Sequence, residues 1–150
     1  MIKPRVALYL LIASAVVVLI GIFIFRFVSK SEPMQVFPAT VMGDCAPWDG
    51  PAFTVSIQYD PGRTIIISIW KSPDIPHRTT YLFPDDSGQL GNAYLAPALN
   101  SYSPMEGKIF LHRVSVDTPI EGWFRLKSER GDLFKGAFKA DWEDTMILCG

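Results

Sequence analysis

The first thirty residues carry one long, uninterrupted hydrophobic run. Residues 7–25 (ALYLLIASAVVVLIGIFIF) contain no charged side chain, and Val6, Phe27 and Val28 extend the run. A helix of about 20 apolar residues crosses the roughly 30 Å hydrocarbon core of a bilayer and bonds its own backbone there. A core helix of a small soluble protein would show a polar side, which this run lacks. The sequence therefore predicts a transmembrane anchor over residues 1–28.

A cleaved signal peptide is the main alternative to a retained anchor. Its apolar part would be about 7–15 residues long and would be followed by small residues at a cleavage site. The run here is longer, residues 26–33 (RFVSKSEP) offer no such site, and Asp44 precedes the first cysteine, Cys45, where a lipoprotein site needs a small residue. We therefore expect a retained anchor, a short linker over residues 29–40 and a domain over residues 41–150.

Beyond the anchor the hydrophobic period changes to two, which is typical of strands with one buried face. Residues 53–59 alternate clearly, and Asp60-Pro61-Gly62-Arg63 is a turn sequence. The return strand, residues 64–71, is rich in β-branched residues, and its continuous apolar character suggests that both of its faces are covered. These features predict a hairpin.

A second hairpin is predicted over residues 120–128 and 132–140. A three-residue loop with Gly131 in the left-handed conformation fixes the register by pairing Ser128 with Asp132. Each phenylalanine of the hairpin then faces a glycine across the ladder, which pins the register: Phe124 faces Gly136, and Phe138 faces Gly122.

Shorter strands are predicted over residues 36–42, 79–83, 90–95, 107–114 and 145–149, with turns at residues 45–51 and 141–144. The expected fold is all-β, an antiparallel sandwich or partly open barrel of about seven or eight short strands, preceded by one transmembrane helix. The segment 72–106 contains five prolines and is irregular, so it either forms functional loops or serves only as a connection.

The only two cysteines, Cys45 and Cys149, stand near the two ends of the predicted domain. Such a pair suggests a disulfide and an oxidising, extracytoplasmic compartment; two unpaired buried thiols are the alternative. Lys and Arg are balanced across the anchor, with two on each side, so the positive-inside rule does not decide the orientation. The cysteines therefore favour a periplasmic or extracellular domain.

Charge and motifs exclude several classes of function. After residue 31 the chain has 15 acidic and 10 basic residues, an unsuitable balance for binding nucleic acid. The sequence has no hydrolase elbow, phosphate loop or metal motif, and the two histidines, His77 and His112, stand apart from any ligand pattern. We expect no cofactor and no metal.

Aromatic residues make up 13% of the chain and supply the candidate binding residues. In the predicted register Trp123 lies on the opposite face from Phe124, beside Arg125 and Lys127. This arrangement would form a binding platform if exposed; the alternatives are burial on both faces or a ring covered by lysine stems. The remaining members of the possible binding patch are Trp70, His77, Arg78, Tyr81 and Tyr94.

The end of the chain resembles a known kind of sequence. Gly107-Lys108-Ile109-Phe110-Leu111, Ile120-Glu121-Gly122-Trp123-Phe124, Gly131, Gly136-Ala137-Phe138-Lys139-Ala140 and Cys149 together resemble small, uncharacterised bacterial envelope domains that end in a G-x-F, G-x-F, C pattern. The resemblance covers the last third of the chain and implies an envelope setting and a β fold, but it transfers no active site. The spacing from Ala140 to Cys149 is longer than in that pattern.

These observations predict a single-pass membrane protein whose outer domain is a non-enzymatic protein-binding or structural module, with another envelope protein as its partner. The alternative is a domain that binds a small ligand or glycan, or hydrolyses one, in the 72–106 region. Its candidate residues are His77, Arg78, Tyr81, Asp85, Asp86 and Tyr94.

Overall fold

The computed structural model describes residues 33–73, 79–84, 90–97, 102–116, 118–143 and 149, and every regular element within these ranges is a strand. The predicted anchor lies outside them. Among the described residues no helix has the length and apolarity needed to cross a membrane. The eight strands are β1 (Val36–Cys45), β2 (Pro51–Asp60), β3 (Arg63–Ile69), β4 (Thr79–Phe83), β5 (Gly91–Pro97), β6 (Ser103–Arg113), β7 (Ile120–Ser128) and β8 (Leu133–Trp142).

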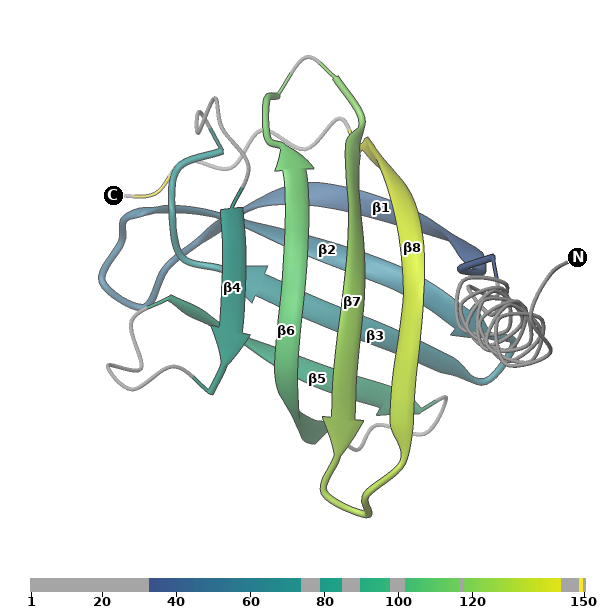
Figure 1. Ribbon diagram of the computed structural model, residues 1–150. Helices are drawn as coiled ribbons and strands as arrows, with labels where there is room; N and C mark the ends of the chain where they lie inside the picture. The colour runs from purple at the N-terminus through teal and green to yellow at the C-terminus, as the bar shows by residue number, and fades with distance from the viewer. Residues whose placement is uncertain are drawn as a thin grey trace, which may run out of the picture. The chain divides into compact units, whose positions relative to one another are not determined.

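Seven of the strands close into a barrel, and the eighth is added at its side. The order is β4-β6-β5-β3-β2-β1-β8-β7, and β7 pairs back with β6 to complete the ring. In Figure 1, β4, β6, β7 and β8 run side by side across the front, while β1, β2, β3 and β5 cross behind them. The all-β prediction is confirmed, and the closed barrel replaces the expected sandwich or partly open barrel.

The barrel is not wholly antiparallel, in contrast to the prediction. Strands β1 and β8 pair in parallel, from Val36 opposite Ala137 to Val41 opposite Trp142, whereas the other pairings are antiparallel. The reason is the number of strands. A ring of seven cannot alternate in direction all the way round, so closing it requires a parallel pair.

Both predicted hairpins are confirmed. Strands β2 and β3 pair from Phe53 opposite Ile69 to Gln58 opposite Thr64. In the second hairpin Phe124 lies opposite Gly136, and Phe138 lies opposite Gly122. This is the register predicted from the three-residue loop that contains Gly131. Gly131 has a φ of 91°, in the region that glycine adopts easily.

One of the two glycines of the second hairpin is covered by the expected ring and the other is not. A side chain at Gly122 would meet Phe138, 2.8 Å from its Cζ atom, in agreement with the predicted pair. A side chain at Gly136 would instead collide with Phe37, which β1 brings over the hairpin. Sequence reasoning missed the second contact because it depends on the pairing of β1 with β8.

Three local predictions need correction. Burial along β3 alternates, with Ile65, Ile67 and Ile69 buried and the residues between them half-buried, so this strand is not fully covered on both faces. Residues 141 and 142 continue β8 rather than forming a turn, because β1 extends alongside them. Strand β6 starts at Ser103, four residues earlier than predicted. The predicted strand at 145–149 lies mostly outside the described residues, which include only Cys149.

The inward side chains of all eight strands form one hydrophobic core. It is rich in isoleucine and phenylalanine, and the largest side chains are completely enclosed, among them Phe53, Ile109 and Phe124. Alternation then directs every second residue of β6, β7 and β8 outward, where these residues form a surface of their own.

Candidate functional site

Three positively charged side chains lie directly opposite one another on the outer surface of the barrel. Lys108 of β6 pairs with Arg125 of β7, and Arg125 pairs with Lys135 of β8. All three are exposed. Like charges opposite each other across strands are destabilising, by about 0.2–1 kcal/mol for each pair. The row is therefore an electrostatic cost that the fold itself does not require.

Acidic residues balance other basic residues on the outer side of these strands but not this row. Lys127 lies 3.8 Å from Glu106, and Lys139 lies 3.6 Å from Glu121. Within the described ranges, Lys108, Arg125 and Lys135 form no ion pair with a carboxylate. The positive charge of the middle row is thus available to an external anion.

An aromatic row runs beside the cations. Phe110 and Trp123 are cross-strand partners, and their rings stack with centroids 5.8 Å apart and an interplanar angle of 18°. The ammonium nitrogen of Lys108 lies 5.2 Å from the centre of the Trp123 ring, a cation–π distance. Trp123 is half-buried, and its ring contacts both Phe110 and the Lys108 ammonium group.

Exposed apolar side chains surround the cations. Leu82 of β4 pairs with Lys108 and is 58% exposed, and Leu133 of β8 is 51% exposed. Met34 and Val36, at the start of the domain, are 52% and 66% exposed. We call this surface the cationic face; it comprises Lys108, Phe110, Trp123, Arg125 and Lys135 with the apolar rim Met34, Val36, Leu82 and Leu133.

Two shallow grooves hollow the cationic face and share the central cations. One has a volume of about 400 Å³ and lies between Met34, Trp123, Leu133 and Lys135. The other, of about 550 Å³, lies between Leu82 and Leu133. Lys108 and Arg125 line both grooves. The surface therefore combines relief, positive charge and apolar contact area.

The structure brings together only part of the binding patch expected from sequence. Trp123, Arg125 and Lys127 point to the same side of β7. Trp70 lies elsewhere, in edge-to-face contact with Trp48 at 5.6 Å, and Tyr94 on β5 contacts Tyr102 at 6.3 Å. His77, Arg78, Asp85 and Asp86 lie outside the described residues.

Tyr81 does not belong to any surface patch, contrary to expectation. It is 1% exposed because odd-numbered residues of β4 face the core. Its hydroxyl has no hydrogen-bond partner within the part of the chain that the structure describes. Burial raises the pKa of the Tyr81 phenol. The residue is a core side chain.

A separate hollow of about 590 Å³ lies where β6 changes partner. Strand β6 pairs with β5 only at Pro104 and Ser103, and from Gly107 onward with β4. The strands separate between these points, and the hollow lies there, lined by Phe83, Asn92 and Met105 among others. The buried Oδ1 atom of Asn92 has no hydrogen-bond partner among the described residues.

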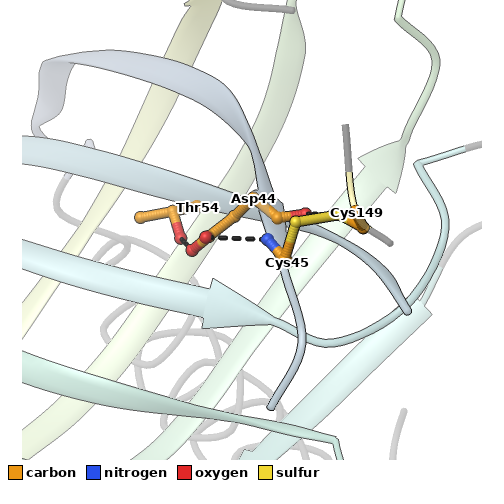
Figure 2. The surroundings of a disulfide bond; sticks show 4 residues. All are labelled: Asp44, Cys45, Thr54 and Cys149. Carbon is orange, nitrogen blue, oxygen red and sulfur yellow. Dashed lines mark hydrogen bonds between the residues drawn. A yellow bond between two sulfur atoms is a disulfide. The ribbon is translucent and has the colours of Figure 1, made fainter. Parts of the chain in front are cut away.

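The predicted disulfide is present. Cys45 and Cys149 are joined with their Cα atoms 5.6 Å apart, at the end of β1 (Figure 2). Asp44 orders the surrounding chain, since its carboxylate accepts hydrogen bonds from the Thr54 hydroxyl at 2.7 Å and from the Cys45 amide at 2.8 Å. The bond fixes residue 149 against the barrel. Within the described ranges no three His, Cys, Asp or Glu side chains gather as a metal site.

Sequence reasoning missed several residues of the cationic face. The predicted hairpin register already pairs Arg125 with Lys135, so this like-charge contact was available from the sequence. Lys108, Phe110 and Met34 were not, because they reach the face through the pairings of β6 with β7 and of β1 with β8, which join distant parts of the chain.

Comparisons with known proteins add no relative. No protein-family model, curated protein or solved structure matches this chain.

Proposed function

We propose that this chain is a single-pass, membrane-anchored extracytoplasmic protein whose barrel is a non-enzymatic binding module of the cell envelope. In this proposal the cationic face binds an anionic partner. The single observation that carries it is the row Lys108–Arg125–Lys135, in which three exposed cations lie opposite one another without a carboxylate from the described chain. A bound anion converts this repulsion into attraction.

The distribution of charge supports the choice of this face. The outer sides of β6, β7 and β8 carry six basic residues against three acidic ones, whereas the chain after residue 31 has ten basic and fifteen acidic residues. The basic side chains are therefore gathered on one side of an otherwise acidic domain. Such an asymmetry steers and orients an anionic partner.

The membrane setting is supported by the uncharged hydrophobic run over residues 7–25. The extracytoplasmic side is supported by the Cys45–Cys149 disulfide, because such bonds persist in oxidising compartments. An envelope protein with an acidic surface has the required chemistry, and so has a membrane surface rich in anionic lipid.

Photocrosslinking in native membranes tests the proposal with the full-length chain. A photoreactive phenylalanine analogue at Leu133, on the rim of the cationic face, should capture a defined species. The same analogue at Trp48, which is exposed away from these strands, is the control. Adduct formation at Leu133 should fall when Arg125 and Lys135 are both changed to Glu. Equal adduct formation at Leu133 and Trp48 contradicts a binding role for this face. So does adduct formation at Leu133 that is the same in the wild type and in the double Glu variant.

A second candidate function rests on the hollow beside Asn92. The Oδ1 atom of Asn92 is buried without a partner in the described chain, and a rotation of the amide toward the hollow would let it accept a hydroxyl or amine proton from a ligand such as a sugar. Cell-wall oligosaccharides should then raise the Tm of the wild-type protein and leave that of Asn92→Ala unchanged. An equal shift in both proteins, or none in either, excludes the site.

A further inference from the structure

We infer that the cationic face docks on the anionic lipid head groups of the membrane that holds the chain's own anchor. This inference rests on the proposed function and names the partner of the proposed face. Three observations support a lipid surface: the apolar composition of the rim, the short stretch of chain between the predicted anchor and the barrel, and the distribution of charge over the barrel.

The rim suits the boundary between head groups and acyl chains. Met34, Val36, Leu82 and Leu133 are each more than half exposed and lie around the cations. At a membrane interface apolar side chains insert toward the acyl region, while Lys and Arg extend to the phosphates. Trp123 adds an indole ring, a group enriched at this depth. A purely acidic partner would match the cations but would leave the apolar rim without a counterpart.

The tether keeps this face within reach of the bilayer. Five residues, 29–33, separate the end of the predicted anchor from Met34. Fully extended, they span at most about 18 Å. Met34 lines the groove that also contains Lys108, Arg125 and Lys135. A short linker raises the effective concentration of the face at the membrane to the millimolar range, so even weak contacts hold it there.

The charge of the barrel favours a single orientation. Each Lys or Arg close to an anionic surface increases binding about fivefold. The acidic remainder of the domain is repelled by the same surface. The barrel should therefore lie with β6, β7 and β8 toward the lipid, and its opposite side should face the aqueous compartment.

The test uses the full-length chain in nanodiscs of phosphatidylcholine, with or without phosphatidylglycerol. A nitroxide on the lipid head group quenches tryptophan fluorescence over a short range. Quenching should increase when phosphatidylglycerol is present, should disappear in high salt, and should be largely lost in Trp123→Phe, which identifies the ring that approaches the lipid.

Matched charge variants separate docking from net charge. Arg125→Glu with Lys135→Glu removes two cations of the face and should lower the equilibrium constant for docking at least about 25-fold. Lys71→Glu with Arg130→Glu changes the net charge equally at positions outside the face and should leave quenching unchanged. Arg125→Gln with Lys135→Gln should show an intermediate loss. A cooperative urea unfolding transition in each variant reports that the barrel is folded.

The outcomes distinguish the two proposals. Lipid docking is overturned if quenching is the same with and without phosphatidylglycerol. It is also overturned if quenching falls equally in the Arg125→Glu, Lys135→Glu variant and in the Lys71→Glu, Arg130→Glu control. If the analogue at Leu133 then crosslinks to a protein, the proposed binding role of the cationic face is retained, and its partner is an acidic protein. If Leu133 captures neither protein nor lipid, the proposed function fails together with the inference.

Discussion

Replacing Arg125 with glutamate should make the protein more stable. Arg125 is the middle member of the cationic row and faces Lys108 on one side and Lys135 on the other. Arg125→Gln removes two repulsive pairs, and Arg125→Glu also creates two attractive ones. Each pair contributes about 0.2–1 kcal/mol. Because the side chains are exposed, we take the lower part of that range and expect gains of about 0.5 kcal/mol for Gln and about 1 kcal/mol for Glu.

The neighbouring residue Lys127 provides a control of opposite sign. It lies 3.8 Å from Glu106, so Lys127→Glu replaces an attraction by a repulsion and should lower stability by about 0.5 kcal/mol. Both substitutions change the net charge equally and both positions lie on the outer side of β7. A difference in sign between them therefore reports local charge pairing and not the net charge of the domain.

The assay is urea unfolding of the full-length chain in a non-ionic detergent, followed by tryptophan fluorescence. At low salt the order of stability should be Arg125→Glu, Arg125→Gln, wild type and then Lys127→Glu. In about 1 M salt the Debye length falls to about 3 Å and the four proteins should converge. A less stable Arg125→Glu, or an order that persists in high salt, would refute the view that the row is an uncompensated repulsion. A stabilised variant that no longer docks would show that the repulsion is retained for binding.

Three further outcomes follow from the structure. Changing Cys45 and Cys149 to serine should lower the unfolding free energy by about 4 kcal/mol, since their bond closes a loop of 104 positions; equal urea midpoints for reduced and oxidised wild type would contradict this. Gly122→Ala should cost about 1–3 kcal/mol in the same assay, because its side chain would press on a backbone carbonyl of β6, whereas Gly62→Ala meets only the Asp60 side chain, at an ordinary contact distance of 3.8 Å, and should cost much less. The pKa of Asp60 is lowered mainly by a hydrogen bond from the arginine three residues on, so its contribution to stability is present above about pH 4 and is lost as pH falls through the lowered pKa. Asp60→Asn should therefore be less stable than wild type at pH 7 and equal to it near pH 2; a difference that stays constant with pH would exclude the ion pair as its cause.

The parts of the fold that could be predicted from the sequence are the pairings between strands that follow each other directly along the chain. The β2–β3 hairpin follows from alternation and a turn sequence, and the β7–β8 hairpin follows from Gly131 and the spacing of phenylalanine and glycine. Both pairings join segments separated by only a few residues. The register of the β7–β8 hairpin also places Arg125 opposite Lys135, so this part of the candidate surface could be predicted from the sequence.

The closure of the barrel was not predictable in the same way. Whether the ring contains seven or eight strands depends on where β4 docks, and no local pattern records that β4 lies outside the ring. With eight strands in the ring every pair could be antiparallel, whereas seven strands require a parallel one. For the same reason the positions of Lys108 and Phe110 on the cationic face could not be predicted. The pairing of β6 with β7 decides which residues lie opposite Arg125 and Trp123, and no local pattern indicates this pairing.

The parallel contact between the first and last strands governs when the barrel can form during synthesis. Val36 pairs with Ala137, 101 positions later, so β1 has no partner on that side until the final strand has left the ribosome. Until then its row of amide and carbonyl groups and the incomplete interior stay accessible to chaperones and to other unfolded chains. Closure of the ring therefore waits for β8, which follows the other seven strands along the described chain.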